Sequence, residues 1–316
     1  MNIDEVLECA TYIDRMKNQP DTIWIPETWG MENFATVAAV SQRAHIPRIG
    51  SSIINVYSRT PALVAMGSVT IDKITDGRFV LGLGASSKPI VERFHGVKYT
   101  MQLDRMREYI DIIRLAFSGK RIDYDGNFFK LRGFKLLSKS SRASIPIYIA
   151  AVNKKMVDLC WQIGDGVIFY LRPLEELKNT LSHMQTTKKI DVACQIITAV
   201  SNDSEKAAER VKTTLAFYVA VGAVYRDFLA KNGFKEEVCA IYEQYKKTGL
   251  DNLHQTVPEK MIRSLAIFGS ADECFENMKR FYNAGIDLPI VQFNPVGDVM
   301  ESFKLAHSAF TGGDRS

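Results

Sequence analysis

Gly82 and Gly84 stand where close approach of a ligand to the backbone would be easiest. They lie at the end of the apolar run Phe79–Leu83, which predicts a buried strand. Glycine lets another group approach the backbone where a side chain would block it. Because Ser87 replaces the third glycine of the dinucleotide-binding GxGxxG pattern, the two glycines alone indicate only a tight turn after a strand.

A second segment has residue types suited to an anion. It joins the end of an apolar run, near residue 151, to the start of a helical pattern at residue 154. Its residues are Ala150, Ala151, Val152, Asn153 and Lys154. Small side chains let a phosphate reach the backbone N–H groups, and the N-terminus of a helix favours a negative charge. Lys154 or Lys155 could add a charge-assisted hydrogen bond. The alternative is a packed strand–helix junction with two surface lysines.

Other site patterns are missing. The chain has no GxxxxGK[ST] phosphate loop and no GxSxG nucleophile motif, which argues against P-loop nucleotidases and α/β hydrolases. Its five histidines are scattered without HExxH, so no metal site is predicted. Its five cysteines form no CxxC pair, which favours reduced thiols and a cytoplasmic location.

The composition of the chain argues against several classes of binding partner. The net charge of +4, from 40 basic and 36 acidic residues, is too small and too diffuse to favour nucleic acid. The longest nearly apolar run, Leu215–Val224, is far shorter than the roughly 20 residues of a membrane span. The acidic beginning of the chain is unlike a secretory signal. A small molecule is therefore the expected partner.

Short β-branched runs alternate with longer helical patterns, which is typical of parallel strands joined by helices. Strands are expected at residues 21–26, 48–54, 79–83, 146–151, 166–170, 191–200 and 289–293. Helices are expected at residues 3–17, 34–44, 61–74, 101–117, 154–163, 173–184 and 272–284, with a helical block at 204–249 and more helix at 258–263. Lys120–Leu137, with Asp125-Gly126 at its centre, predicts a hairpin-like excursion. Seven strands fit either an open doubly wound sheet or an eight-stranded barrel that lacks one strand.

Several segments together resemble one family, the luciferase-like flavin or deazaflavin oxidoreductases. Within it the chain is most similar to the coenzyme F420-dependent branch, which is methylenetetrahydromethanopterin reductase-like. The matching segments are Ile23–Gly30, Arg59–Met66, Ile71–Ser86, Phe94–Gly96, Ile145–Ala151 and Asp165–Val167. No single motif decides the resemblance, which runs from about residue 20 to 190, but the ordered set is fairly specific.

The resemblance implies a single (β/α)8 TIM-like barrel domain over residues 1–316, with a helical insertion at about 204–263. The family opens with a strand before its first helix, whereas this chain opens with a helical pattern. We therefore expect the first strand to be missing from the chain. Either the reading frame begins further upstream or the domain closes differently.

The resemblance also implies a cofactor site at the carboxyl ends of the strands. The ring would rest on a bulge with a non-prolyl cis peptide between Ser52 and Ile53. The exit of the next strand would contact it through Gly82, Gly84, Ala85 and Ser86. The segment from Ala150 to Lys154 would bind a phosphate, over which Tyr170 and Arg172 would close, unless Arg172 is simply exposed.

Three residues are candidates for catalysis. Related deazaflavin enzymes often carry Asp-His after the strand at residues 21–26, where this chain has Glu27-Thr28. Glu27 could supply or orient a proton, or be a solvated loop carboxylate, and Trp29 could form a wall of the site. His95 is a second candidate for proton transfer, although a lone histidine is more often structural.

The leading hypothesis is an F420-dependent oxidoreductase that moves a hydride between the deazaflavin C5 and a small organic substrate. An FMN-dependent luciferase-like monooxygenase is the first alternative. A non-catalytic flavin-binding or partner subunit is the second, since the first strand and the Asp-His pair are both missing. By resemblance we also expect a homodimer that packs through residues 34–44 and 61–74.

Overall fold

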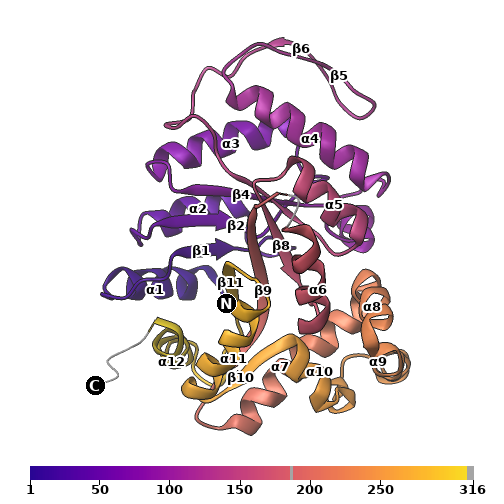
Figure 1. The fold of residues 1–316 in the computed structure, drawn as a ribbon. Coiled ribbons are helices and arrows are strands. Elements are labelled where there is room, and N and C mark those ends of the chain that lie inside the picture. The colour runs from indigo at the N-terminus through magenta and orange to yellow at the C-terminus, as the bar shows by residue number, and fades with distance from the viewer. Residues whose placement is uncertain (186–187, 312–316) are drawn as a thin grey trace. The chain divides into compact units, whose positions relative to one another are not determined.

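The structure is a computed structural model that describes residues 1–185 and 188–311. The chain divides into two compact units (Figure 1). The first unit is Asn2–Ile168, and the second is Phe169–Ser316 together with Met1. The single domain over residues 1–316 that the sequence suggests stays a prediction.

The first unit is built on a parallel sheet. Its strands are β1 (Thr22–Ile25), β2 (Arg48–Ser51), β3 (Ile54–Asn55), β4 (Phe79–Gly84), β7 (Ile147–Ala150) and β8 (Gly166–Tyr170), the last of which runs into the second unit. The order is β1-β2-β4-β7-β8, and β3 pairs with β4 beyond the point where β2 ends. All six residues of β4 are buried, so this strand lies at the centre of the unit.

Helices connect these strands, as the apolar periodicity predicts. They are α1 (Ile3–Asp14), α2 (Asn33–Ser41), α3 (Pro61–Ile74), α4 (Gln102–Phe117) and α5 (Lys154–Ile163), with a short π-helix, η1, at Ile90–Phe94. Their starts follow ordinary capping chemistry: Asn2 and Glu5 form a capping box on α1, and Thr60 caps α3 ahead of Pro61. The first described element is a helix, as the sequence predicts.

Large and small side chains alternate across this sheet. Trp24 on β1 lies opposite Gly50 on β2, and a Cβ on Gly50 would be 2.5 Å from the indole ring. Tyr148 on β7 lies opposite Gly166 on β8, where a Cβ would be 2.7 Å from the phenol ring. The Trp24 and Tyr148 rings are 5.7 Å apart. The two glycines therefore make room for two aromatic rings on one face of the sheet.

The excursion predicted at Lys120–Leu137 is confirmed. It is an antiparallel hairpin of β5 (Ile122–Asp125) and β6 (Lys130–Phe134), which lies beyond α4 in Figure 1. The buried carboxylate of Glu108 on α4 accepts the N–H groups of Asn127 and Phe128 at 2.7 and 3.0 Å. One side chain thus ties the hairpin turn to the helix.

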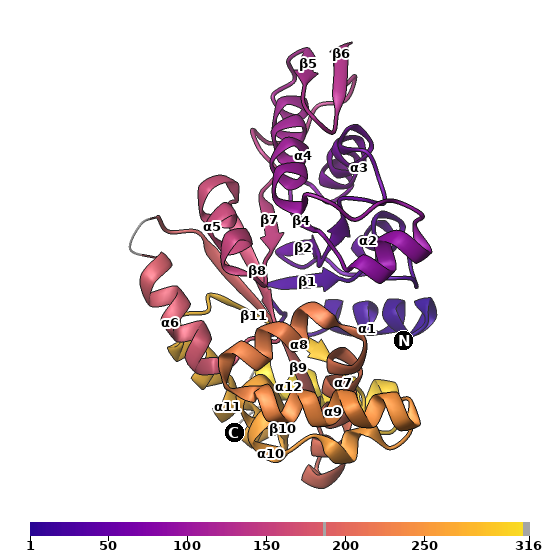
Figure 2. The same cartoon turned by 90° about the vertical axis from the view of Figure 1, so that its right-hand side faces the viewer.

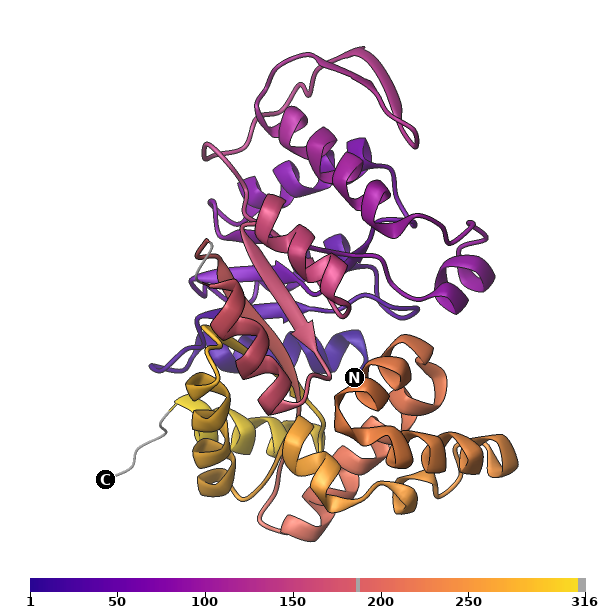
Figure 3. The same ribbon diagram turned by 45° about the vertical axis from the view of Figure 1, so that its right-hand side comes forward.

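The second unit is centred on β9 (Asp191–Val200), which pairs in parallel with both β10 (Ala266–Gly269) and β11 (Leu288–Phe293). Its helices are α6 (Leu174–Met184), α7 (Ser204–Val221), α8 (Ala223–Leu229), α9 (Lys235–Thr248), α10 (Glu259–Leu265), α11 (Ala271–Asn283) and α12 (Val299–Thr311), with η2 (Ala230–Phe234) and η3 (Leu253–Thr256). The residues predicted as a helical insertion, about 204–263, hold the helices from α7 to α10, whose orange members lie together in Figures 2 and 3; that they form an insertion stays a prediction.

The seven expected strands are all present, but the sequence analysis missed β10, α12 and the short helices η1 and η3. Strand β10 has only four residues and directly follows α10, so its apolar run continues the helical pattern. Helix α12 lies beyond the last expected strand. The expected strand at residues 48–54 is divided into β2 and β3, and the break between them belongs to the candidate site.

Candidate active site

Strand β2 separates from β4 after Gly50 although Ser51 still pairs with Ile25 on β1, and the Ser51 hydroxyl bridges to the backbone of Gly82. Its Oγ accepts the N–H of Gly82 at 2.7 Å and donates to the carbonyl of Gly82 at 3.0 Å. A Cβ on Gly82 would lie 1.9 Å from the backbone oxygen of Ser51, a distance no side chain tolerates. Only glycine at position 82 therefore lets β4 lie this close to Ser51, at the end of β2.

The peptide bond between Ser52 and Ile53 is cis, which confirms the sequence expectation. Beyond it the Ile53 side chain lies over Gly84, where a Cβ would be 2.5 Å from Ile53 Cδ1 and 3.3 Å from the Cβ of Ala150. Three predicted cofactor residues from neighbouring segments are thus brought together. The Ile53 side chain is partly exposed and occupies the space that a side chain on residue 84 would fill, and the Ala150 Cβ borders the same space. We call Ile53, Gly84 and Ala150 the backstop.

The loop that leaves β4 has a defined shape. Ala85 and Ser86 are partly exposed, and Ser86 adopts a left-handed conformation with φ +59°. The Tyr99 hydroxyl donates to the Ser86 carbonyl at 3.2 Å. Burial raises the pKa of Tyr99 to about 12, so this hydroxyl keeps its proton at neutral pH. Sequence reasoning missed Tyr99, because nothing in its neighbourhood marks it as a donor to a loop 13 residues away.

The N-terminus of α5 has the features predicted for an anion site. Asn153 occupies the cap position, but its side chain makes no capping bond, and the first turn carries no acidic residue. Backbone N–H groups at such an end are available to an anionic ligand. The Lys154 ammonium lies along the helix against Asp158, at 3.0 Å, and is largely exposed. The phosphate role of this segment stays a prediction.

Glu27 lies in a more enclosed setting than a solvated loop carboxylate. Its two oxygens accept from the two terminal nitrogens of Arg59 at 2.6 and 2.7 Å, and one of them also accepts the N–H of Asn33 at 3.0 Å. The side chains of Glu27 and Arg59 are only 12% and 13% exposed. The solvated alternative is therefore wrong, and the carboxylate has an anchoring partner that the sequence did not reveal.

The other two catalytic candidates are less constrained. Trp29 is 58% exposed in the loop between β1 and α2. His95 ends η1, is partly exposed, and its ring meets the edge of Phe94 at 4.9 Å. No hydrogen bond among the described residues joins His95 to Glu27, so the structure does not assemble them into an acid–base pair.

Tyr170 and Arg172 belong to the second unit. Arg172 donates through Nη1 to both carboxylate oxygens of Glu176 at 2.7 and 2.5 Å. Its guanidinium lies 4.4 Å from the Phe169 ring and 4.7 Å from the Phe228 ring, and its side chain is 2% exposed. The exposed alternative is therefore wrong, because the charge is enclosed and neutralised locally. Its contact with a phosphate stays a prediction.

Tyr170 lies in a group of perpendicular phenol rings. Its ring centre is 5.0 Å from Tyr218 on α7 and 5.5 Å from Tyr225 on α8. Edge-to-face pairs at these distances are favourable packing arrangements. Burial raises the pKa of Tyr170 well above its ordinary value, so its hydroxyl is a donor and not a base. Its role as a cofactor contact also stays a prediction.

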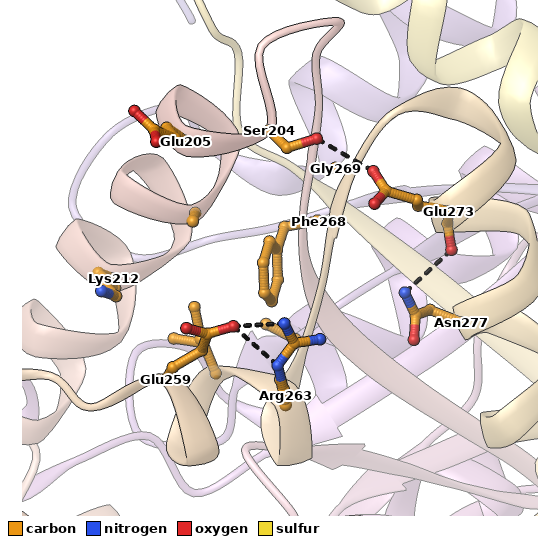
Figure 4. Close-up of a pocket in the computed structure, with 12 residues that line it drawn as sticks. Ser204, Glu205, Lys212, Glu259, Arg263, Phe268, Gly269, Glu273 and Asn277 are labelled. Atoms are coloured by element: carbon orange, nitrogen blue, oxygen red, sulfur yellow. Dashed lines mark hydrogen bonds and ion pairs between the residues drawn. The ribbon is translucent and has the colours of Figure 1, made fainter.

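A separate hollow of about 240 Å³ lies in the second unit, between α7, α10, β10 and the start of α11 (Figure 4). Phe268 stands at its centre, Arg263 pairs with Glu259, and Ser204 donates to Glu273 at 3.0 Å. None of the predicted site residues lines it. The hollow is therefore distinct from the backstop and the α5 terminus.

Neither a metal cluster nor a membrane-spanning helix is present among the described residues. No group of three or more His, Cys, Asp or Glu side chains is arranged there to hold a metal ion. None of the helices in the same part of the chain combines the length and apolar character that a membrane crossing requires.

Comparison with known proteins agrees with the resemblance. A family model for luciferase-like monooxygenases matches residues 1–288. The 5,10-methylenetetrahydromethanopterin reductase of Archaeoglobus fulgidus is 30% identical over 300 residues, 90% of this chain and 89% of that protein. A putative coenzyme F420-dependent oxidoreductase of Mycobacterium tuberculosis is 26% identical over 298 residues, 86% of each chain.

The fold has a solved counterpart. The coenzyme F420-dependent tetrahydromethanopterin reductase from Methanopyrus kandleri aligns with a TM-score of 0.86 at 19% identity, over 98% of this chain and 95% of that chain. This likeness confirms the TIM-like barrel and decides against an open doubly wound sheet. The names of the relatives from Archaeoglobus and Mycobacterium show that the chain is an oxidoreductase. The chain belongs to the luciferase-like monooxygenase family.

Proposed function

We propose that this protein is a coenzyme F420-dependent oxidoreductase that transfers a hydride between the deazaflavin C5 and a small organic substrate. The observation that carries the proposal is the backstop, in which the Ile53 side chain lies over Gly84 and the Ala150 methyl group borders the same space. The names of the relatives from Archaeoglobus and Mycobacterium point to the same chemistry.

The residues present fit such a cofactor. A Cβ at position 84 would collide with Ile53, so glycine keeps a flat, supported apolar surface for a ring. Ser52, Ile53, Gly82, Gly84, Ala85 and Ser86 would hold the ring. The uncapped N-terminus of α5, with Ala150, Ala151, Val152, Asn153 and Lys154, would hold the phosphate. Tyr170 and Arg172 are the proposed cover of that phosphate.

The bound cofactor would supply the hydride, and the protein would supply position and access. Ile53 would lie against one face of the bound ring, and the substrate would approach the other face. Trp29 would be a wall of the substrate side. His95 is the candidate for any proton transfer that the substrate needs.

A binding titration tests the proposal. Oxidised F420 and FMN are added separately to the purified protein, and fluorescence is followed; the reduced forms are added in parallel. Tight binding of F420 with weak binding of FMN supports hydride transfer. Preference for FMN would move the assignment to a monooxygenase, and binding of neither to the folded protein would indicate a non-catalytic subunit.

We further propose a cytoplasmic homodimer that packs through α3. Leu63 and Met66 on this helix are 51% and 54% exposed, and Ile74 is also exposed, which is a large apolar content for a solvent-facing helix. The companion prediction, that α2 contributes, rests on resemblance alone. Sedimentation of the wild type and of Met66→Lys tests the dimer, since a charge on this face should yield monomer.

A further inference from the structure

One guanidinium holds both ends of the loop between β1 and α2. Arg59 donates to both oxygens of Glu27, at the beginning of the loop, at 2.6 and 2.7 Å. The same side chain donates to Glu32, at the end of the loop. The stretch between them, residues 28–31, is exposed at residues 28–30 and includes Trp29. The shape of this stretch therefore depends on a residue 27 positions beyond its end.

Arg59 is itself held by residues of two helices, α4 and α2. The backbone carbonyl of Arg59 accepts from the hydroxyl of buried Tyr109 on α4 at 3.1 Å. Its guanidinium lies over the ring of Phe34 at 5.7 Å. Glu32 also caps α2 by accepting the N–H of Ala35 at 2.7 Å. The loop between β1 and α2 is thus tied, through Arg59, to the connection between β3 and α3 as well.

The charges define what Glu27 can do. The hydrogen bonds that Arg59 donates to Glu27 are the main cause that raises the pKa of Arg59 above its ordinary value, so this side chain is always a cation and a donor. Glu27 accepts three hydrogen bonds from donors that cannot accept in return, which is the pattern of an ionised carboxylate. An ionised group that is fully engaged as an acceptor has no proton to deliver.

We propose that Arg59 is a positioning residue of the active site: it clamps Glu27 and Glu32 and thereby sets the place of Trp29, with Glu27 as an anchor and not a proton donor. The link to catalysis rests on the proposed function. The anchoring itself does not, because it concerns contacts that exist without cofactor or substrate.

The clamp is tested in the full-length protein by amide hydrogen exchange of the peptide that spans residues 26–33. In Arg59→Met we expect exchange to become faster by about tenfold or more, since two carboxylates lose their shared partner. Arg59→Lys should be intermediate, because one ammonium cannot grip two carboxylates as a fork does. Arg142→Met is the matched control, since it removes a guanidinium from buried Asp72 elsewhere in the same unit.

A spectroscopic readout follows Trp29. It is the most exposed of the three tryptophans, so its emission anisotropy reports loop motion, and Trp29→Phe identifies its share of the signal. We expect anisotropy to fall in Arg59→Met and to stay at the wild-type value in Arg142→Met. Should Arg59→Met fail to fold, Glu32→Gln replaces it, since this change releases only one end of the loop.

The variant Glu27→Gln distinguishes an anchoring role of Glu27 from a role as proton donor. With Glu27 as an anchor, the variant keeps one good acceptor, so F420 affinity should stay within about threefold of wild type and the pH profile of turnover should not change shape. Loss of one limb of that profile would overturn the proposal, and so would unchanged loop exchange in Arg59→Met. If the wild type binds no F420, the proposed function fails while the exchange result still decides the clamp.

Discussion

The backstop makes Gly84→Ala the sharpest test of where the cofactor ring lies. The added Cβ would stand 2.5 Å from Ile53 Cδ1 and 2.7 Å from Ile53 Cγ1. Both atoms belong to a partly exposed side chain, which can rotate away, so the loss of stability should be about 1 kcal/mol, the low end for overpacking. A rotated Ile53 no longer offers the same surface. We expect F420 affinity to fall by about tenfold, or about 1.4 kcal/mol.

Gly67→Ala is the matched control for this experiment. A Cβ on Gly67 would also lie 2.5 Å from a side-chain atom, Cε2 of Phe34, but in the packing of α3 against α2. The two variants should lose similar stability in urea denaturation, whereas only Gly84→Ala should bind F420 weakly in the fluorescence titration. Wild-type affinity in Gly84→Ala would refute the backstop as the resting place of the ring, because the surface cannot survive the added methyl unchanged.

Three further predictions address the phosphate site, the buried arginine and the hairpin. Asn153→Asp should stabilise α5 by about 0.5 kcal/mol as a charged cap yet weaken F420 binding about fivefold by repulsion of the phosphate; equal affinity would remove the phosphate from this helix. Arg172→Met should lower the free energy of unfolding by about 3 kcal/mol because it strands Glu176, and adding Glu176→Gln should restore part of it. If the double variant is stable but has lost F420 affinity, Arg172 contacts the cofactor directly. Glu108→Ala should cost about 2 kcal/mol in denaturation and speed proteolysis of the hairpin, with F420 affinity unchanged; a hairpin that stays protected would show that other contacts hold it.

The sequence predicted those parts of the fold that local pattern controls. Helices α3 and α5 begin and end at the predicted residues, because a cap, a first-turn proline or regular apolar spacing marks them. Strand β10 was missed because four residues carry too little period to be separated from the helix before them. Local pattern also could not show that Ser51 would complete the ladder of Gly82, which depends on contact between segments 31 residues apart.

Charge partners were the least predictable part of the candidate site. Glu27 and Arg59 both lie in segments that carried the family resemblance, yet no spacing rule joins residues 32 apart. Arg172 gave no sign of burial, since its partner Glu176 is an ordinary i,i+4 neighbour and its two aromatic neighbours lie on different elements. Sequence alone therefore identifies which side chains can carry charge, whereas only the fold shows which of those charges are already committed.

The glycines of the sheet show how one residue type takes two roles along a strand. Gly50 and Gly166 lie opposite aromatic rings, and their missing side chains are filled by Trp24 and Tyr148. At the carboxyl end of β4 the missing side chains of Gly82 and Gly84 are filled instead by a backbone oxygen and by Ile53. A ring that fills a gap stabilises the core. The glycines of β4 matter for a different reason, because they let the segment that holds Ser51 and Ile53 pass close to this strand.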